Sequence, residues 1–204
     1  MQTDESDERL MARFQGGDAS AFEALLHRHR GPVYNFLVRT TRDRGRAEDL
    51  LQETWLKVVT AAPRWEKRAR FTTWLYTIAR NLSVDEARRA ALRGAERLEA
   101  PADPAGERRP LLQTVASDDP LPDRSAESAM LRPRLQAALA SLPEEQREVF
   151  VLREYAGLPF QEIAAVTGVP ENTVKSRMRY ALDGLRRRLE EMGVTAEAAE
   201  VAAP

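Results

Sequence analysis

Cysteine is absent from this chain of 204 residues, which excludes a disulfide framework, a thiolate nucleophile and a cysteine zinc site. Aromatic residues make up only 6% of the sequence, a share that suits small helical domains better than one large β core. No segment approaches the roughly 18 apolar residues that a membrane-spanning helix needs, and the acidic N-terminus lacks the apolar core of a signal peptide. We therefore expect a cytoplasmic protein without membrane insertion.

The residue patterns of common enzyme sites are also missing. The sequence has no glycine-rich phosphate loop, and no serine, histidine and aspartate set that converges. His27 and His29 stand two residues apart on a predicted helix, which turns them to different faces, so we expect both at the surface. We predict no catalytic residue, no metal site and no cofactor, and hence a protein that is not an enzyme.

The charge of the chain is small in total but unevenly distributed. The net charge is −1, whereas residues 18–89 hold fourteen basic and nine acidic residues, a balance of +5. Residues 90–130 hold five basic and eight acidic residues, a balance of −3. Locally basic modules separated by an acidic spacer favour docking at specific sites over general coating of nucleic acid.

Apolar residues recur at helical spacing in the first half of the chain. The pattern predicts helices over about 18–41, 44–61 and 71–89, with Asp18 as the first N-cap and with Gly31-Pro32 bending or loosening the first helix. In the middle helix, Trp55, Val58 and Val59 are among the residues predicted to face inward. Together the three helices would form a compact helical bundle, residues 18–92, after a lead-in of residues 1–17.

Residues 93–127 lose this periodicity and contain five of the twelve prolines, together with scattered acidic residues. A structureless stretch of this length is unusual inside a compact domain, so we interpret it as a disordered, flexible linker. Residues 128–191 are predicted to form a four-helix domain, in which the segment from Ser141 to Glu144 resembles a capping box. Residues 192–204 form a tail. The expected fold class is all-α, with two small helical domains.

The segment from Phe160 to Arg188 has the spacing of a helix-turn-helix. Ala164 is small enough for two helices to approach, Gly168 permits the positive φ of a turn, and Val174 would be buried between the helices. The second helix carries a basic face of the kind that reaches phosphates and base edges in a major groove. The alternative is an ordinary helical hairpin with a solvated basic face. The candidate DNA-binding residues are Thr173, Lys175, Ser176, Arg177, Arg179 and Tyr180.

A second candidate surface lies on the helix predicted over 44–61. Four polar side chains occupy its edge away from the apolar stripe, namely Glu48, Asp49, Gln52 and Glu53. A solvated face is the default interpretation of charges on an amphipathic helix, and the local sequence favours it. The functional alternative is a docking surface for a basic partner.

The third candidate surface is the stretch from Trp65 to Asn81, where basic residues alternate with aromatic ones. Aromatic rings stack on unpaired bases while cations follow the backbone, the combination that single-strand binders use. The alternative is that the aromatic residues belong to the core, which we favour for Trp74. The candidate residues for nucleic-acid binding are Trp65, Lys67, Arg68, Arg70, Tyr76, Arg80 and Asn81, with Tyr76, Arg80, Asn81 and the loop from Glu66 to Arg70 expected to be exposed.

Four segments in this order resemble the extracytoplasmic-function (ECF) sigma factors of bacterial RNA polymerase: AEDLLQETWLKVV, RFTTWLYTIARN, SLPEEQREVFVLREYAGLPFQEIA and GVPENTVKSRMRYAL. The resemblance covers nearly all of residues 18–189 apart from the linker. It implies that residues 18–92 are sigma domain 2 and residues 128–191 are sigma domain 4. In several places the chain departs from the family pattern: Glu66-Lys67 follows Trp65, Tyr180 stands where arginine is frequent, and Pro170 stands where serine or threonine is common, in what we expect to be the first helical turn.

The resemblance also implies partners. The edge that carries Asp49, Gln52 and Glu53 would dock on the clamp helices of the largest polymerase subunit, and domain 4 would contact the flap of the second-largest subunit. The aromatic-basic stretch would open the minus-ten promoter region and capture a flipped base, with Asn81 in the base pocket. The helix-turn-helix would bind the minus-thirty-five element, the linker would thread toward the active-site cleft, and an anti-sigma factor would clamp both domains.

Two alternatives belong to other classes of protein. A stand-alone helix-turn-helix regulator that dimerises would account for the C-terminal half, but not for the acidic edge, the aromatic-basic stretch or the linker. An adaptor that has lost DNA binding would tolerate the loss of Lys175 and Arg179.

Overall fold

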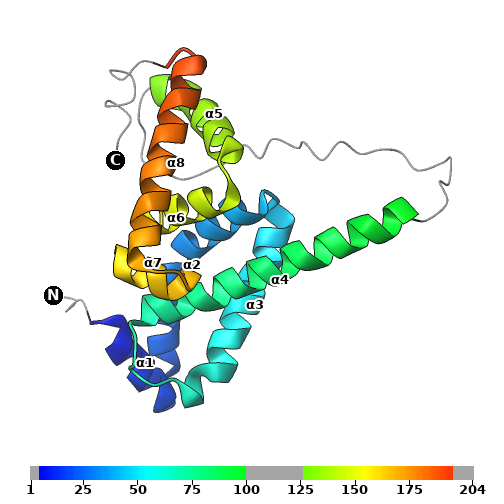
Figure 1. The fold of residues 1–204 in the computed structure, drawn as a ribbon. Coiled ribbons are helices and arrows are strands. Elements are labelled where there is room, and N and C mark those ends of the chain that lie inside the picture. The colour runs from blue at the N-terminus through cyan, green and yellow to red at the C-terminus, as the bar shows by residue number, and fades with distance from the viewer. Residues whose placement is uncertain (1–4, 100–125, 195–204) are drawn as a thin grey trace. The chain divides into compact units, whose positions relative to one another are not determined.

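The computed structural model describes residues 5–99 and 126–194, and every regular element within these ranges is helical (Figure 1). The chain divides into two compact units, one built from helices α1 to α4 and the other from α5, α6, α8 and most of α7. The predicted all-α, two-domain fold is therefore confirmed. None of the described helices is both long and apolar enough to cross a membrane.

The first unit contains α1 (Asp7–Gln15), α2 (Ala19–Thr41), α3 (Arg44–Ala61), the short 3-10 helix η1 (Ala62–Arg64) and α4 (Phe71–Glu99). Helix α2 packs against α1, α3 and α4, so it forms the centre of the bundle. α3 has the bounds predicted from the sequence. α4 continues ten residues beyond its predicted end at Arg89, and α5 begins at Ala126, so residues 93–99 and 126–127 are helical rather than part of a disordered linker. Residues 100–125 of that linker lie outside the described residues.

Asp18 caps α2, as the sequence predicts. Its carboxylate accepts a hydrogen bond from the backbone N–H of Ser20 at 3.0 Å. Hydrogen bonds from Ser20 and Arg13 lower the pKa of the Asp18 carboxyl to about 2. The helix then continues through Pro32 to Thr41 as one element.

Helix α1 was not predicted, since the sequence suggests only a lead-in over residues 1–17. Leu10 and Met11 are buried, and the ring of Phe14 lies 4.9 Å from that of Phe22 in α2. One Asp7 carboxylate oxygen lies 2.7 Å from His29 Nε2, and the other accepts a hydrogen bond from Arg28. His29 is only 8% exposed, so the prediction that it lies at the surface is wrong; His27 is exposed as predicted.

The same contact perturbs the Asp7 carboxyl. Burial by itself would raise its pKa, but the hydrogen bonds and positive charges of His29 and Arg28 outweigh burial and lower the pKa. The ionised form of Asp7 therefore stabilises the packing of α1 on α2.

Tyr76 corrects a second prediction, because it belongs to the core and not to an exposed surface. Its side chain is only 1% exposed and packs edge-on against the Phe36 ring, with the ring centroids 5.5 Å apart. Burial raises the pKa of the Tyr76 hydroxyl well above its ordinary value. No hydrogen-bond partner for this hydroxyl lies among the described residues. Val59, predicted to face inward, is instead exposed.

The second unit contains α5 (Ala126–Ser141), α6 (Glu144–Glu154), α7 (Phe160–Thr167) and α8 (Glu171–Glu191). The predicted capping box at Ser141 is wrong. Ser141 is the last residue of α5, its hydroxyl donates to the Ala138 carbonyl at 2.7 Å, and α6 begins after Pro143 without a capping side chain. The buried Arg147 holds the α5–α6 turn by donating to the Leu142 carbonyl at 3.2 Å.

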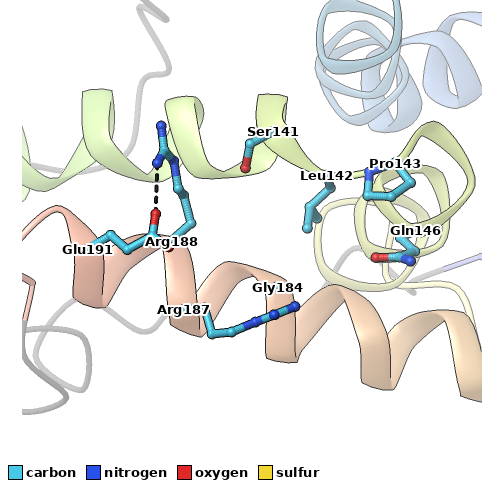
Figure 2. Close-up of a pocket in the computed structure, with 8 residues that line it drawn as sticks. All are labelled: Ser141, Leu142, Pro143, Gln146, Gly184, Arg187, Arg188 and Glu191. Carbon is cyan, nitrogen blue, oxygen red and sulfur yellow. Dashed lines mark hydrogen bonds and ion pairs between the residues drawn. The ribbon is translucent and has the colours of Figure 1, made fainter.

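Helix α8 approaches this turn very closely at Gly184. A Cβ atom on Gly184 would lie 2.8 Å from Cδ2 of Leu142, which is closer than carbon atoms pack. Leu142 and Pro143 lie at the turn beside α8 (Figure 2). Together with Gly184 they line a pocket of about 300 Å³. Glycine at position 184 therefore permits the contact that joins α8 to the turn.

Candidate functional site

The helix-turn-helix has the local geometry that its sequence predicts. Gly168 ends α7 with a φ of +72°, and its N–H donates to the Ala164 carbonyl at 2.9 Å. Ile163 and Val174 are fully buried. Pro170 stands at the N-cap of α8, one position before the first helical turn in which we expected it, and its carbonyl accepts from the N–H groups of Thr173 and Val174.

Helix α8 presents a row of polar side chains away from its buried stripe. Lys175, Ser176, Arg179 and Tyr180 are exposed, and Thr173 is partly exposed. The Arg179 guanidinium lies over the Tyr180 ring, 5.1 Å from its centroid, so the cation and the ring form one surface feature. Asn172, which the sequence analysis passed over, is exposed in the first turn of the same helix.

Arg177 differs from its neighbours because its side chain turns toward α6. Its Nη2 atom lies 2.7 Å from a carboxylate oxygen of Glu145, and only 20% of its side chain is exposed. Arg177 therefore joins α8 to α6 and does not belong to the exposed row of α8.

The acidic edge of α3 also contains an apolar residue that the sequence analysis missed. Glu48, Asp49 and Gln52 are exposed, and Glu53 is partly exposed. Leu56 stands four residues after Gln52, so the two side chains share a face, and Leu56 is 66% exposed. We call Glu48, Asp49, Gln52, Glu53, Leu56 and Val59 the α3 face. The available signal in the sequence was the position of Leu56, which falls outside the i, i+3, i+4 spacing of the buried residues Leu51, Trp55 and Val58.

The ion pairs on the α3 face are weak. Asp49 lies 4.0 Å from Arg46, and Glu53 lies 3.9 Å from Lys57, both at the limit of an ion pair. Exposed pairs of this kind contribute at most about 1 kcal/mol. The carboxylates therefore remain available to a basic partner.

Residues 65–70, which we call the 65–70 loop, join η1 to α4. Lys67, Arg68 and Arg70 are exposed, and Glu66 pairs with Arg68 at 2.6 Å. Trp65 is partly exposed, and its ring centroid lies 6.3 Å from that of Trp74 on α4. Trp74 is likewise only partly buried, although the sequence favours it as a core residue.

The outer face of α4 continues from this aromatic pair. Trp74, Thr77 and Asn81 are spaced three and four residues apart, so they lie on one face, and Asn81 is exposed. Arg80 beside them is partly buried. Tyr76 lies on the opposite side of the helix, so the candidate nucleic-acid surface consists of the 65–70 loop, Trp74, Arg80 and Asn81 without it.

No group of three or more histidine, aspartate or glutamate side chains in the described parts of the chain is placed to hold a metal ion.

Comparison with known proteins identifies the family. The model of sigma-70 region 2 matches residues 25–93, and that of sigma-70 region 4 matches residues 132–183. The RNA polymerase sigma factor CarQ of Myxococcus xanthus is 37% identical over 89% of this chain and 97% of its own length. The ECF RNA polymerase sigma factor SigL of Mycobacterium tuberculosis is 34% identical over 91% of this chain and 99% of its own length. The chain is an ECF sigma factor.

Solved structures share the fold of this sigma factor. The structure of CnrH in complex with the cytosolic domain of CnrY has a TM-score of 0.66 at 23% identity, covering 92% of this chain and 99% of that one. The sigma factor RpoE in complex with the anti-sigma factor NepR, from Bartonella quintana, has a TM-score of 0.67 at 21% identity, covering 83% and 96%.

The matched regions locate the candidate surfaces within the sigma factor. Region 2 contains the α3 face, the 65–70 loop and Asn81, whereas region 4 contains α7 and the part of α8 that carries the exposed row. A sigma factor is a transcription initiation factor, which binds core RNA polymerase and directs it to promoters. The alternative of a stand-alone dimeric regulator is not favoured, since the match to region 2 accounts for the half of the chain that such a regulator leaves unexplained.

Proposed function

We propose that this sigma factor docks on core RNA polymerase through the α3 face and reads a promoter with two separate surfaces. One observation carries this proposal: each matched sigma region has an exposed surface with side chains suited to binding nucleic acid. Region 2 also has the α3 face, which is suited to docking on a protein. The α3 face would meet the clamp helices of the largest subunit. Domain 4 would meet the flap of the second-largest subunit.

The chemistry of the α3 face supports a basic, partly apolar partner. Gln52 and Glu53 stand one turn before Leu56 on its helix and Asp49 stands two turns before it, so an apolar anchor lies beside a group of acceptors. Interfaces commonly combine an apolar centre with a polar rim. Burying an exposed leucine contributes about 1.5–3 kcal/mol, which makes Leu56 the main expected anchor of this contact.

The 65–70 loop and the outer face of α4 form the proposed minus-ten surface. Trp65 and Trp74 supply partly exposed rings for stacking on unpaired bases, and Lys67 and Arg68 supply charge for the backbone. Asn81 supplies an amide for base edges in the pocket of a flipped base. Stacking of this kind stabilises the unpaired strand and so favours melting of the promoter.

The exposed row of α8 forms the proposed minus-thirty-five surface. Ser176, Arg179 and Tyr180 face outward at the start of the helix, while Lys175 lies at its edge within 2.7 Å of Glu171. Arg179 would contact base edges, and Lys175 would contact phosphate. Arg177, held by Glu145, supports the packing of α8 instead.

The proposal includes three further statements. The protein has no catalytic activity of its own, it works in the cytoplasm, and an anti-sigma factor controls it. The last statement is supported by the solved structures of similar fold, one of which is a sigma factor in complex with an anti-sigma factor.

Competition for core polymerase tests the docking role with a matched control. Leu56 on α3 and Leu92 on α4 are both 66% exposed, so alanine removes the same exposed side chain at each position. Leu56→Ala should weaken core binding about ten-fold and lower run-off transcription, whereas Leu92→Ala should leave both unchanged. Equal effects of the two substitutions would contradict the assignment. A wild-type protein that gives no promoter-dependent transcript, yet binds a palindromic duplex alone, would instead be a stand-alone regulator.

A further inference from the structure

Helix α1 precedes the matched sigma-70 region 2, and it contacts two parts of the first unit at once. One side packs on α2, through the buried Leu10 and Met11 and through the contact between Asp7 and His29. Another side contacts η1 and α4, the two elements that flank the 65–70 loop. Helix α1 therefore connects the body of the bundle to both ends of this loop.

Two side chains of α1 reach those ends directly. The amide nitrogen of Gln15 donates to the backbone carbonyls of Ala62, the first residue of η1, and Trp65, the first residue of the loop, both at 2.8 Å. The carboxylate of Glu8 accepts from the backbone N–H of Phe71 at 3.1 Å, where the loop ends and α4 begins. Glu8 and Gln15 are seven residues apart, which places them two turns apart on the same face of α1, about 10 Å along its axis.

Two of these bonds satisfy backbone groups without a helical partner, the Trp65 carbonyl and the Phe71 N–H, whereas the Ala62 carbonyl also accepts from the Trp65 N–H. The first N–H groups of a helix have no acceptor within it, and a capping side chain normally comes from the residue just before the helix. For α4 the acceptor comes from Glu8, 63 residues earlier in the chain. A carboxylate at this position also interacts favourably with the positive end of the helix dipole.

The backbone also holds both ends of the loop locally. The Trp65 N–H donates to the Ala62 carbonyl at 3.0 Å, and the Arg70 carbonyl accepts from the Trp74 N–H at 3.2 Å. Within it, the Arg68 N–H donates to the Glu66 carbonyl at 2.7 Å, and their side chains pair at 2.6 Å, so these contacts shape its middle. Gln15 at its start and Glu8 at its end add the side-chain hydrogen bonds that join the loop ends to α1, a helix distant in sequence.

We propose that α1 is the positioning element of the promoter-reading loop, with Gln15 and Glu8 as its positioning residues. This inference rests on the minus-ten role proposed above for the 65–70 loop. Neither residue needs to touch DNA. By fixing both ends of the loop before DNA arrives, they reduce the ordering that base capture requires and keep Trp65 beside Trp74.

The loop itself offers a test that is independent of DNA. Trypsin cleaves after Lys67, Arg68 and Arg70, and cleavage requires local opening of the loop ends. In the free, full-length protein, Gln15→Met removes both donated hydrogen bonds at nearly constant length and should raise cleavage in the loop about ten-fold. Gln161→Met, at an exposed position on α7, is the matched control and should leave it unchanged. Sites are assigned by mass spectrometry of the fragments.

Glu8 provides a further control through conservative replacement. Glu8→Gln retains an oxygen acceptor for the Phe71 N–H and should keep cleavage of the loop within about two-fold of the wild type, whereas Glu8→Ala should raise it about five-fold. Fast cleavage in Glu8→Ala and slow cleavage in Glu8→Gln would support the capping bond. Cleavage that is unchanged in both Gln15→Met and Glu8→Ala would overturn the proposal.

Promoter discrimination tests whether this positioning serves DNA reading. With core polymerase, open complexes are measured by permanganate on a promoter selected by the wild-type holoenzyme and on templates with single minus-ten or minus-thirty-five substitutions. Gln15→Met should lower minus-ten discrimination several-fold and leave minus-thirty-five discrimination unchanged. Faster trypsin cleavage with unchanged minus-ten discrimination would overturn the positioning role. If the double variant Lys67→Ala, Arg68→Ala opens the promoter normally, the minus-ten role of the loop itself is wrong, whatever the trypsin result.

Discussion

Replacing Tyr76 by phenylalanine should stabilise the first unit. The Tyr76 side chain is 1% exposed, and its hydroxyl has no hydrogen-bond partner among the described residues. The substitution removes this oxygen and retains the ring that packs edge-on against Phe36. The substitution also distinguishes a core role for Tyr76 from a role in contacting bases, since a base-contacting tyrosine would need its hydroxyl at the surface.

The size of the effect follows from two opposing terms. Burying a hydroxyl without a partner costs about 1–3 kcal/mol in mutational data. Removing one oxygen atom leaves a small void, which costs about 0.5 kcal/mol. The free energy of unfolding should therefore rise by about 1 kcal/mol, and the Tm of a unit of this size should rise by about 4–8 °C.

Tryptophan fluorescence measures this unit selectively. All three tryptophans, Trp55, Trp65 and Trp74, lie in the first unit, so their emission during urea or thermal unfolding reports on it alone. Tyr34→Phe is the matched control because Tyr34 is partly exposed, and it should change the free energy of unfolding by less than about 0.5 kcal/mol. Run-off transcription by Tyr76→Phe should equal that of the wild type.

A Tyr76→Phe variant that unfolds at lower urea concentration than the wild type would refute this reasoning, because it would mean that the hydroxyl forms a favourable contact. Normal stability with impaired promoter opening would return Tyr76 to the proposed minus-ten surface, from which its burial excludes it.

Two further predictions concern the packing of each unit. Asp7→Asn should destabilise the first unit by about 1–2 kcal/mol at neutral pH. Because the folded pKa of Asp7 is lowered, its contribution is present above the ordinary pKa of 3.8 and is lost as the pH falls through the folded value, so urea unfolding curves of variant and wild type should converge below pH 3.8. Gly184→Ala should destabilise the second unit by about 1 kcal/mol, since crowding of Leu142 outweighs the gain in helix propensity. In a Leu142→Ala background, Gly184→Ala should instead stabilise the second unit. The free energy of unfolding is measured by circular dichroism in urea, and a Gly184→Ala that remains destabilising in this background would contradict the reasoning.

Local patterns in the sequence were sufficient for much of the fold. The bounds of α3, the N-cap at Asp18 and the positive φ of Gly168 each depend on residues close together in the chain, and each is found in the structure. The helix-turn-helix was predictable for the same reason, because its contacts join residues within about twenty positions.

The errors arise where contacts are distant in sequence. Helix α1 has only nine residues, too few to be stable alone, and its stability comes from partners such as His29 that the sequence does not place nearby. Tyr76 and Trp74 stand two positions apart and face different sides of α4, and the aromatic composition did not distinguish the buried ring. The small residues Ala79 and Ser83, three and seven positions after Tyr76, were the available signal, since both are buried with it.

The close approach of Gly184 to Leu142 has a consequence for engineering promoter specificity. Helix α8 is one continuous rod from Glu171 to Glu191, anchored to α5 and α6 along its length, and Arg179 lies five residues, or about 7.5 Å, from Gly184. Because α8 is a single helix, a displacement of the helix at Gly184 also displaces Arg179. We therefore expect that a graft of residues 171–180 into another domain 4 preserves base preference only when Gly184 and Leu142, which set the position of α8, are transferred as well.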